Sequence, residues 1–117
     1  MTDSDIEELN RLCSGVQELE EGGSTYIFLP ALALPPQCIP ANVDALLRIS
    51  SRVINDYPTR LFFAQRITFN KTSALQLNWN ANNVVILQRT WHAFSWAGVN
   101  NTGRMVEVLA QHLGAFK

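Results

Sequence analysis

Apolar residues recur at three- and four-residue steps along the first twenty positions of the chain. The repeating positions are Ile6, Leu9, Leu12, Cys13, Val16 and Leu19. Ser4 followed by Glu7 has the form of a capping box, and Gly22-Gly23 is a strong stop signal. The spacing therefore predicts an amphipathic helix over residues 4–19, with Cys13 on its buried face.

Beyond this segment, short apolar runs alternate with turn-forming residues. Residues 25–29 are β-branched and aromatic and are bounded by glycine and proline, which predicts a buried strand. The prolines of residues 30–40 predict an ordered loop or a sheet edge. Further strands are predicted over 43–49, 60–69 and 84–87, with a turn at 55–58 and a polar stretch over 70–83. Residues 91–96 either extend the last strand or form a bend.

A second helix is predicted at the end of the chain, over residues 102–116. Asn100, Asn101 and Thr102 can cap it. The residues on its apolar face are Met105, Leu109, His112, Leu113 and Phe116. The order of elements indicates one α+β domain over residues 1–117: an N-terminal helix, a four-stranded antiparallel meander and a C-terminal helix.

Composition and charge narrow the function classes. A hydrophobic fraction of 47% and a charged fraction of 16% are typical of a globular domain. Seven of the ten acidic residues but only one of the nine basic residues lie in the first 21 positions, so this segment carries −6 and the remainder +5. Such a segment is either a solvated helix face or a surface for a basic partner, and the net charge of −1 disfavours nucleic acid.

Neither export nor membrane insertion is indicated. The first residues are acidic where a signal peptide is basic, and no apolar run reaches ~18 residues. A cytoplasmic protein is therefore expected, with Cys13 and Cys38 as reduced thiols rather than a disulfide. Together with His92 and His112, these cysteines match no zinc-ligand spacing, so neither a metal nor a cofactor is expected.

Four strings occur in a fixed order within residues 24–113. They are Leu34-Pro-Pro-Gln-Cys-Ile39, Val43-Asp-Ala-Leu-Leu-Arg-Ile49, Tyr57-Pro58 and Arg89-Thr-Trp-His-Ala-Phe-Ser95. In this order they resemble a bacterial branch of the ubiquitin-conjugating-enzyme family, which shows a proline loop, a Val-Asp-x-Leu-Leu strand, a Tyr-Pro turn and a Trp-x-x-(Trp/Phe)-Ser segment. The resemblance implies a ubiquitin-conjugating-enzyme-like fold and a role in a bacterial ubiquitin-like protein modification pathway. Its implied partners are a ubiquitin-like protein and an activating-enzyme-like protein, with a JAB-type metallopeptidase in the same pathway.

The chain departs from that family where the family carries its chemistry. The conjugating cysteine follows the Tyr-Pro turn, yet residues 39–117 contain no cysteine, and the usual His-Pro-Asn is missing. A Ser-Arg-His string common in the branch is replaced by Ser95-Trp96-Ala97. The remaining catalytic candidates are Cys38, which precedes the second strand, and His92; structural roles suit both better.

Aromatic residues supply the candidate binding surface. The side chains that can anchor a partner are Phe62, Trp79, Trp91, Phe94 and Trp96. We therefore expect a non-catalytic, conjugating-enzyme-like binding module, whose partner is one of the proteins named above or a second copy of the chain. The alternatives are an active conjugating enzyme that forms a thioester through Cys38, and an unrelated small adaptor or chaperone.

Overall fold

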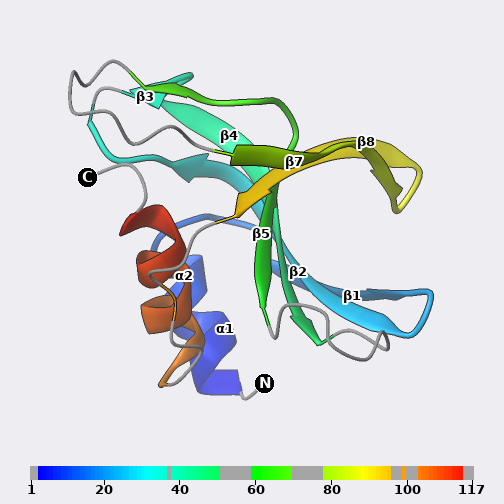
Figure 1. Ribbon diagram of the computed structural model, residues 1–117. Helices are drawn as coiled ribbons and strands as arrows, with labels where there is room; N and C mark the ends of the chain where they lie inside the picture. The colour runs from blue at the N-terminus through cyan, green and yellow to red at the C-terminus, as the bar shows by residue number, and fades with distance from the viewer. Residues whose placement is uncertain are drawn as a thin grey trace.

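The computed structural model describes residues 3–36, 38–50, 59–69, 78–95, 99 and 103–114. Its elements are α1 (Asp3–Asn10), β1 (Gln17–Glu21), β2 (Ser24–Ala33), β3 (Cys38–Ile39), β4 (Asn42–Ser50), β5 (Arg60–Phe63), β6 (Thr68–Phe69), β7 (Asn78–Ile86), β8 (Arg89–Ser95) and α2 (Met105–Leu113). Figure 1 shows the two helices side by side against one face of a strongly curled sheet.

Six of the strands form one antiparallel sheet, a half-barrel in the order β1-β2-β4-β5-β8-β7. The short strands β3 and β6 pair separately. The predicted arrangement, a four-stranded meander of the ubiquitin-conjugating-enzyme type flanked by helices, is therefore wrong. The described part of the protein is mostly sheet, and its two helices are short.

The N-terminal helix is shorter than predicted because the chain reverses after Asn10. The side chain of Asn10 accepts a hydrogen bond from the Val16 N–H at 3.0 Å, which closes the loop between helix and strand. Residues of the predicted helix from Gln17 onward form β1 instead. Gly22 and Gly23, with φ of 59° and 81°, make the two-residue turn that joins β1 to β2. Two successive glycines are as typical of a hairpin turn as of a helix stop.

Three other predicted boundaries also move. Strand β2 runs through Pro30 to Ala33 past an irregularity between Leu29 and Leu32, where a loop was expected. The predicted strand 60–69 divides into β5 and β6. Strand β7 begins at Asn78, within the polar stretch 70–83, and residues 91–95 belong to strand β8. The expected turn at 55–58 lies outside the described residues.

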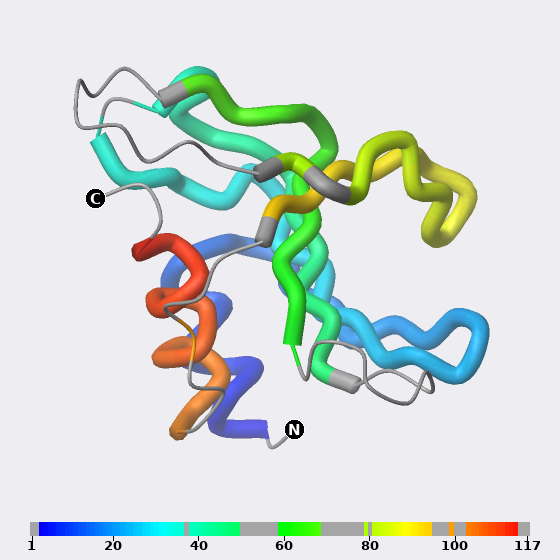
Figure 2. The backbone as a smooth tube through the Cα atoms, in the orientation of Figure 1, coloured from blue at the N-terminus to red at the C-terminus, as the bar shows by residue number. Residues whose placement is uncertain are grey.

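Apolar side chains occupy both faces of the sheet. The cluster beneath the helices includes Leu9, Ile27, Leu29, Ala45, Leu47, Leu61, Phe63, Phe94 and Leu109. The cluster on the concave face consists of Tyr26, Leu46, Phe62, Ile86, Trp91 and Ala93. Leu46 and Leu47 are neighbours in β4 but belong to different clusters, as the two-residue period of a strand requires. The hairpins β1–β2 and β7–β8 project on the side of the sheet away from the helices (Figure 2).

Acidic side chains of α1 hold the start of α2. Glu8 Oε2 lies 2.6 Å from Arg104 Nη1, and Asp5 Oδ1 accepts a hydrogen bond from the Met105 N–H at 3.3 Å. Glu7 is exposed, as expected for a solvated helix face. Part of the acidic excess of the N-terminal segment therefore lies at the contact between α1 and α2. No helix among the described residues is long and apolar enough to cross a membrane.

Replacing Leu9 by alanine tests the packing of α1. Leu9 has 0% of its surface exposed and belongs to the cluster beneath the helices. We expect Leu9→Ala to lower the free energy of unfolding by ~2–4 kcal/mol, because it leaves a cavity in a closed core. Urea denaturation measures this change, and the exposed Leu12→Ala variant is the matched control. Equal midpoints for the two variants would show that α1 is detached in solution.

His112 of α2 gives the fold a pH dependence. It is buried, as its place on the predicted apolar face requires, and its Nε2 lies 2.9 Å from Thr59 Oγ1. Burial, together with the positive charge of Arg60, lowers the pKa of His112 to about 4. The folded state therefore holds a neutral imidazole that the unfolded chain protonates near its ordinary pKa of ~6.5.

Neutral His112 contributes its full stabilisation when the pH is above the pKa that His112 has in the unfolded chain. This contribution is lost as the pH falls from ~6.5 towards 4. We expect the free energy of unfolding to drop by about 2 kcal/mol between pH 7 and pH 5. Urea denaturation at the two pH values measures this, and His112→Gln, which does not titrate, isolates the contribution of His112. An unchanged pH dependence in that variant would contradict the assignment.

Candidate functional site

A groove of about 240 Å³ opens on the concave face, between the β1–β2 and β7–β8 hairpins. Its lining residues are Gln17, Leu19, Phe28, Leu46, Leu87, Arg89 and Trp91. Leu19, Phe28 and Leu87 are half-buried and provide its accessible apolar surface, whereas Leu46 and Trp91 are buried beneath. The sheet alternation explains the strand residues of this set, because they point to the face opposite the helices, whereas Leu87 reaches the groove from the turn between β7 and β8.

The floor of the groove is fixed by Trp91. Only 2% of its surface is exposed, and its indole N–H donates to the Ile86 carbonyl at 3.0 Å. The ring meets Phe28 edge to face, with ring centres 6.5 Å apart. A buried indole with its polar group satisfied is a rigid support, so the groove has a defined floor.

The rim of the groove is an unusual hairpin turn. Leu87 and Gln88 join β7 to β8 with φ of 54° and 64°, since Ile86 pairs with Arg89. Positive φ at both residues is the type I′ geometry, for which Asn-Gly is the preferred sequence. The Leu87 N–H donates to the carboxylate of Glu21 at the end of β1, and this bond ties the two hairpins together at one end of the groove.

Arg89, the first residue of β8, also lines the groove. Its guanidinium carbon is 4.9 Å from the centre of the Trp91 ring, and its Nη1 lies 2.9 Å from Asp44 Oδ2. The side chains of Arg89 and Asp44 are 46% and 32% exposed, so the ion pair is half in solvent and contributes little to stability. The ion pair instead fixes the direction of the Arg89 side chain, because the guanidinium is held both by Asp44 and by the Trp91 ring.

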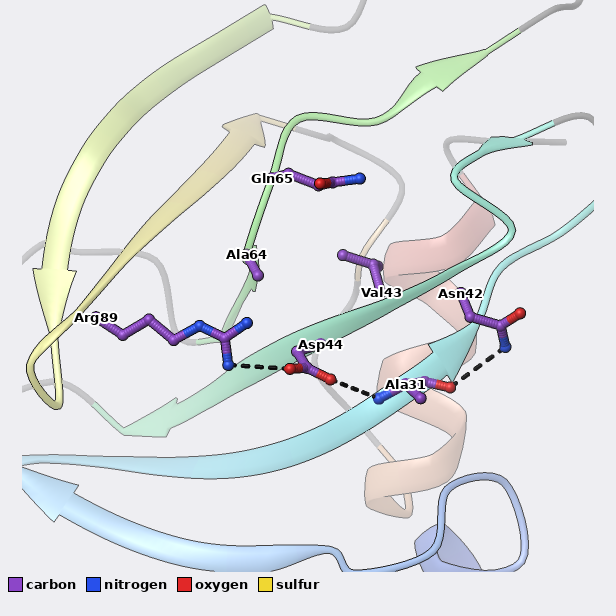
Figure 3. A pocket seen from close by; sticks show the side chains of 7 residues that line it. All are labelled: Ala31, Asn42, Val43, Asp44, Ala64, Gln65 and Arg89. Atoms are coloured by element: carbon purple, nitrogen blue, oxygen red, sulfur yellow. Dashed lines mark hydrogen bonds and ion pairs between the residues drawn. The ribbon is translucent and has the colours of Figure 1, made fainter.

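A second, polar pocket of about 260 Å³ adjoins this arginine (Figure 3). Its lining residues are Ala31, Asn42, Val43, Asp44, Ala64, Gln65 and Arg89. Ala31 lies at the irregularity of β2 and has a φ of 49°. Its N–H donates a hydrogen bond to Asp44 Oδ1 at 2.8 Å, and its carbonyl accepts one from Asn42 Nδ2 at 3.3 Å. The Ala31 N–H, helped by Arg89 and opposed by partial burial, lowers the pKa of Asp44. Asp44 is therefore the charged group that holds both the strand irregularity and Arg89.

The predicted binding residues are distributed over both faces of the sheet. Trp91 lies in the groove, whereas Phe62 is buried on the concave face, with the guanidinium carbons of Arg48 and Arg60 each 5.7 Å from its ring centre. On the helix side, the Phe94 ring lies 5.1 Å from that of Trp79, which is half-buried. Trp96 lies outside the described residues. The role of these aromatic residues in binding stays a prediction.

The catalytic candidates are not brought together into a recognisable site. Cys38 is buried in β3, and burial raises the pKa of its thiol, as it does for Cys13. His92 is half-buried, and its Nδ1 accepts a hydrogen bond from the Asn83 N–H at 3.3 Å. Within the described ranges, no group of His, Cys, Asp and Glu side chains is arranged to hold a metal ion.

Sequence reasoning missed the residues that shape the groove. The apolar run 84–87 predicts Leu87 as the end of a strand, because Leu-Gln carries none of the glycine or asparagine that marks a type I′ turn. Arg89 and Asp44 stand far apart in the sequence, and only the pairing of β5 with both β4 and β8 brings their strands together. The comparisons with protein-family models, curated proteins and solved structures find no match to the chain.

Proposed function

We propose that this protein is a non-catalytic binding module whose concave groove receives a segment of a partner protein. The observation that carries the proposal is the turn at Leu87 and Gln88. A bulky residue in the left-handed region costs roughly 1–2 kcal/mol relative to ordinary backbone. The strain keeps an apolar side chain over the groove, where the preferred Asn-Gly turn would leave none.

The composition of the groove supports a protein partner. Half-buried apolar side chains surround an arginine whose direction is fixed by Asp44 and Trp91. Arginine and aromatic residues dominate the energetics of protein interfaces where the partner packs over them and removes them from water. A segment of partner chain can place an apolar side chain in the groove and a polar group at Arg89.

The chemistry of the thiols supports a function without catalysis. A conjugating nucleophile must be an accessible thiolate, and a lowered pKa makes a cysteine reactive. Burial acts in the opposite direction on both Cys13 and Cys38. A thioester route through Cys38 therefore has no support in the geometry around that residue.

The sequence resemblance nominates the partners. We expect a ubiquitin-like protein or an activating-enzyme-like protein of a bacterial modification pathway, encoded near this chain. Co-expression with the neighbouring genes, followed by pull-down and intact mass measurement, tests this. Failure to recover either protein with the wild-type chain would remove the pathway from the proposal and leave the groove without an assigned partner.

A change of the turn separates binding from stability. We expect Leu87→Asn with Gln88→Gly to leave the free energy of unfolding unchanged or to raise it by up to ~1 kcal/mol, because it supplies the preferred type I′ sequence. The same variant should weaken partner binding about tenfold or more, since one apolar side chain leaves the groove. Gln88→Gly alone keeps Leu87 and is the matched control. Equal affinities for the double variant and its control would contradict the groove as the binding site.

Replacing Cys38 by serine tests the absence of thioester chemistry. We expect Cys38→Ser to bind the partner with the affinity of the wild-type chain, because the thiol is buried and its pKa is raised. Incubation with the activating-enzyme-like protein, the ubiquitin-like protein and ATP should yield no thiol-sensitive adduct by intact mass. An adduct that is removed by reductant and absent from the serine variant would establish the active enzyme instead.

A further inference from the structure

Strand β1 forms one edge of the six-stranded sheet and borders the groove. Along β1 and β2, residue pairs that are hydrogen-bonded alternate with pairs that are not. Glu21 and Ser24 form the pair next to the turn, and Glu20 and Thr25 form the following pair. In a hairpin with a two-residue turn, the pair next to the turn is hydrogen-bonded and the following pair is not. The backbone N–H and C=O groups of Glu18 and Glu20 therefore point away from β2, along the outer edge of the sheet.

The side chains of β1 divide between the two faces. Gln17 and Leu19 line the groove, and Glu21 bonds to the turn at Leu87. Glu18 and Glu20 point to the opposite face, where both are exposed. An incoming chain along this edge thus meets backbone groups ready to pair, an apolar groove on one face and two carboxylates on the other.

We propose that an extended segment of a partner protein adds to the outer edge of β1 as a further antiparallel or parallel strand. Its side chains alternate: aliphatic residues lie over the groove on the side of Leu19, and lysine or arginine residues lie beside Glu18 and Glu20. This mode rests on the proposed function, because it specifies how the partner segment enters the same groove. Main-chain hydrogen bonds supply the affinity in strand addition, and alternate side chains supply the specificity.

The opposite edge of the sheet is less suited to strand addition. Strand β7 has register irregularities between Asn78 and Ala81 and again between Ala81 and Val84. Such bulges interrupt the straight row of backbone groups that a new strand requires. Strand β1 pairs in register along all five of its residues, and its charge pattern selects a basic partner.

Phage display tests strand addition to β1. A library of random peptides of about 12 residues is panned against the immobilised full chain. We expect the enriched peptides to alternate aliphatic residues with lysine or arginine and to lack proline within the alternating run. Enriched peptides without a two-residue period, or with acidic residues at the alternating positions, would overturn strand addition at β1.

Synthetic copies of an enriched peptide then measure each part of the surface by fluorescence anisotropy. Glu18→Pro removes one outward N–H without breaking the pairing with β2, so we expect binding to weaken about tenfold relative to Glu18→Ala. The double variant Glu18→Lys with Glu20→Lys should bind the basic peptide about tenfold more weakly than the wild-type chain does. The same variant should bind a copy of the peptide that has glutamate at each basic position. This charge exchange decides the question if the proline variant does not fold.

The two proposals fail in different ways. Peptides that bind Glu18→Pro and the charge-reversed variant as tightly as wild type, but lose affinity when Leu87→Asn and Gln88→Gly are combined, would overturn strand addition and leave the groove in place. A library that yields no enriched peptide, or peptides whose affinity none of these changes alters, would overturn both.

Discussion

The structure depends on one constraint: the sheet carries apolar side chains on both faces, and the two helices among the described residues cover one of these faces. Beneath α1 and α2, residues such as Leu9, Ile27 and Leu47 form a closed core. The opposite face carries Trp91, Leu46 and other large apolar side chains. A flat sheet would leave these in water, at a cost of about 25 cal/mol for each Å² of apolar surface. The curl of the sheet removes them from water, and the twist natural to antiparallel strands makes the curl possible.

The groove exists because this curl is incomplete. In a closed barrel the two edge strands pair and no edge remains. Here β1 and β7 are the two ends of the sheet order, and Glu21 bridges the two hairpins by accepting a hydrogen bond from the Leu87 N–H. Leu19 and Phe28 are consequently half-buried rather than buried, although they lie beside the fully enclosed Leu46. The strain at Leu87 is understandable in this setting, because a leucine at the turn extends the apolar lining over the open side.

The sequence predicted which residues are buried better than which elements they form. Leu9, Cys13 and Val16 are all buried, yet only the first belongs to a helix. Val16 and Leu19 continue the helical spacing by coincidence, since β1 is too short to display its own period clearly. The strand after the prolines was predicted correctly. On α2, Leu109 and His112 are buried as predicted, but the buried Val108 was not among the predicted positions, and Phe116 lies outside the described residues. The groove was not predictable, because it requires the sheet order and a turn whose sequence lacks the usual signal.

The charges of β1 bear on which partner its edge can accept. An unpaired edge strand is a hazard, and acidic side chains protect it by repelling other edges of the same kind. A second copy of this chain that paired β1 with β1 would bring Glu18 and Glu20 of both copies together, so the same residues oppose self-association through this edge. A basic segment at the same edge would instead be attracted by the carboxylates of Glu18 and Glu20. The acidic bias at the start of the sequence thus has two parts: Asp5 and Glu8 contact the start of α2, and in the proposed binding mode the carboxylates of β1 discriminate between partners.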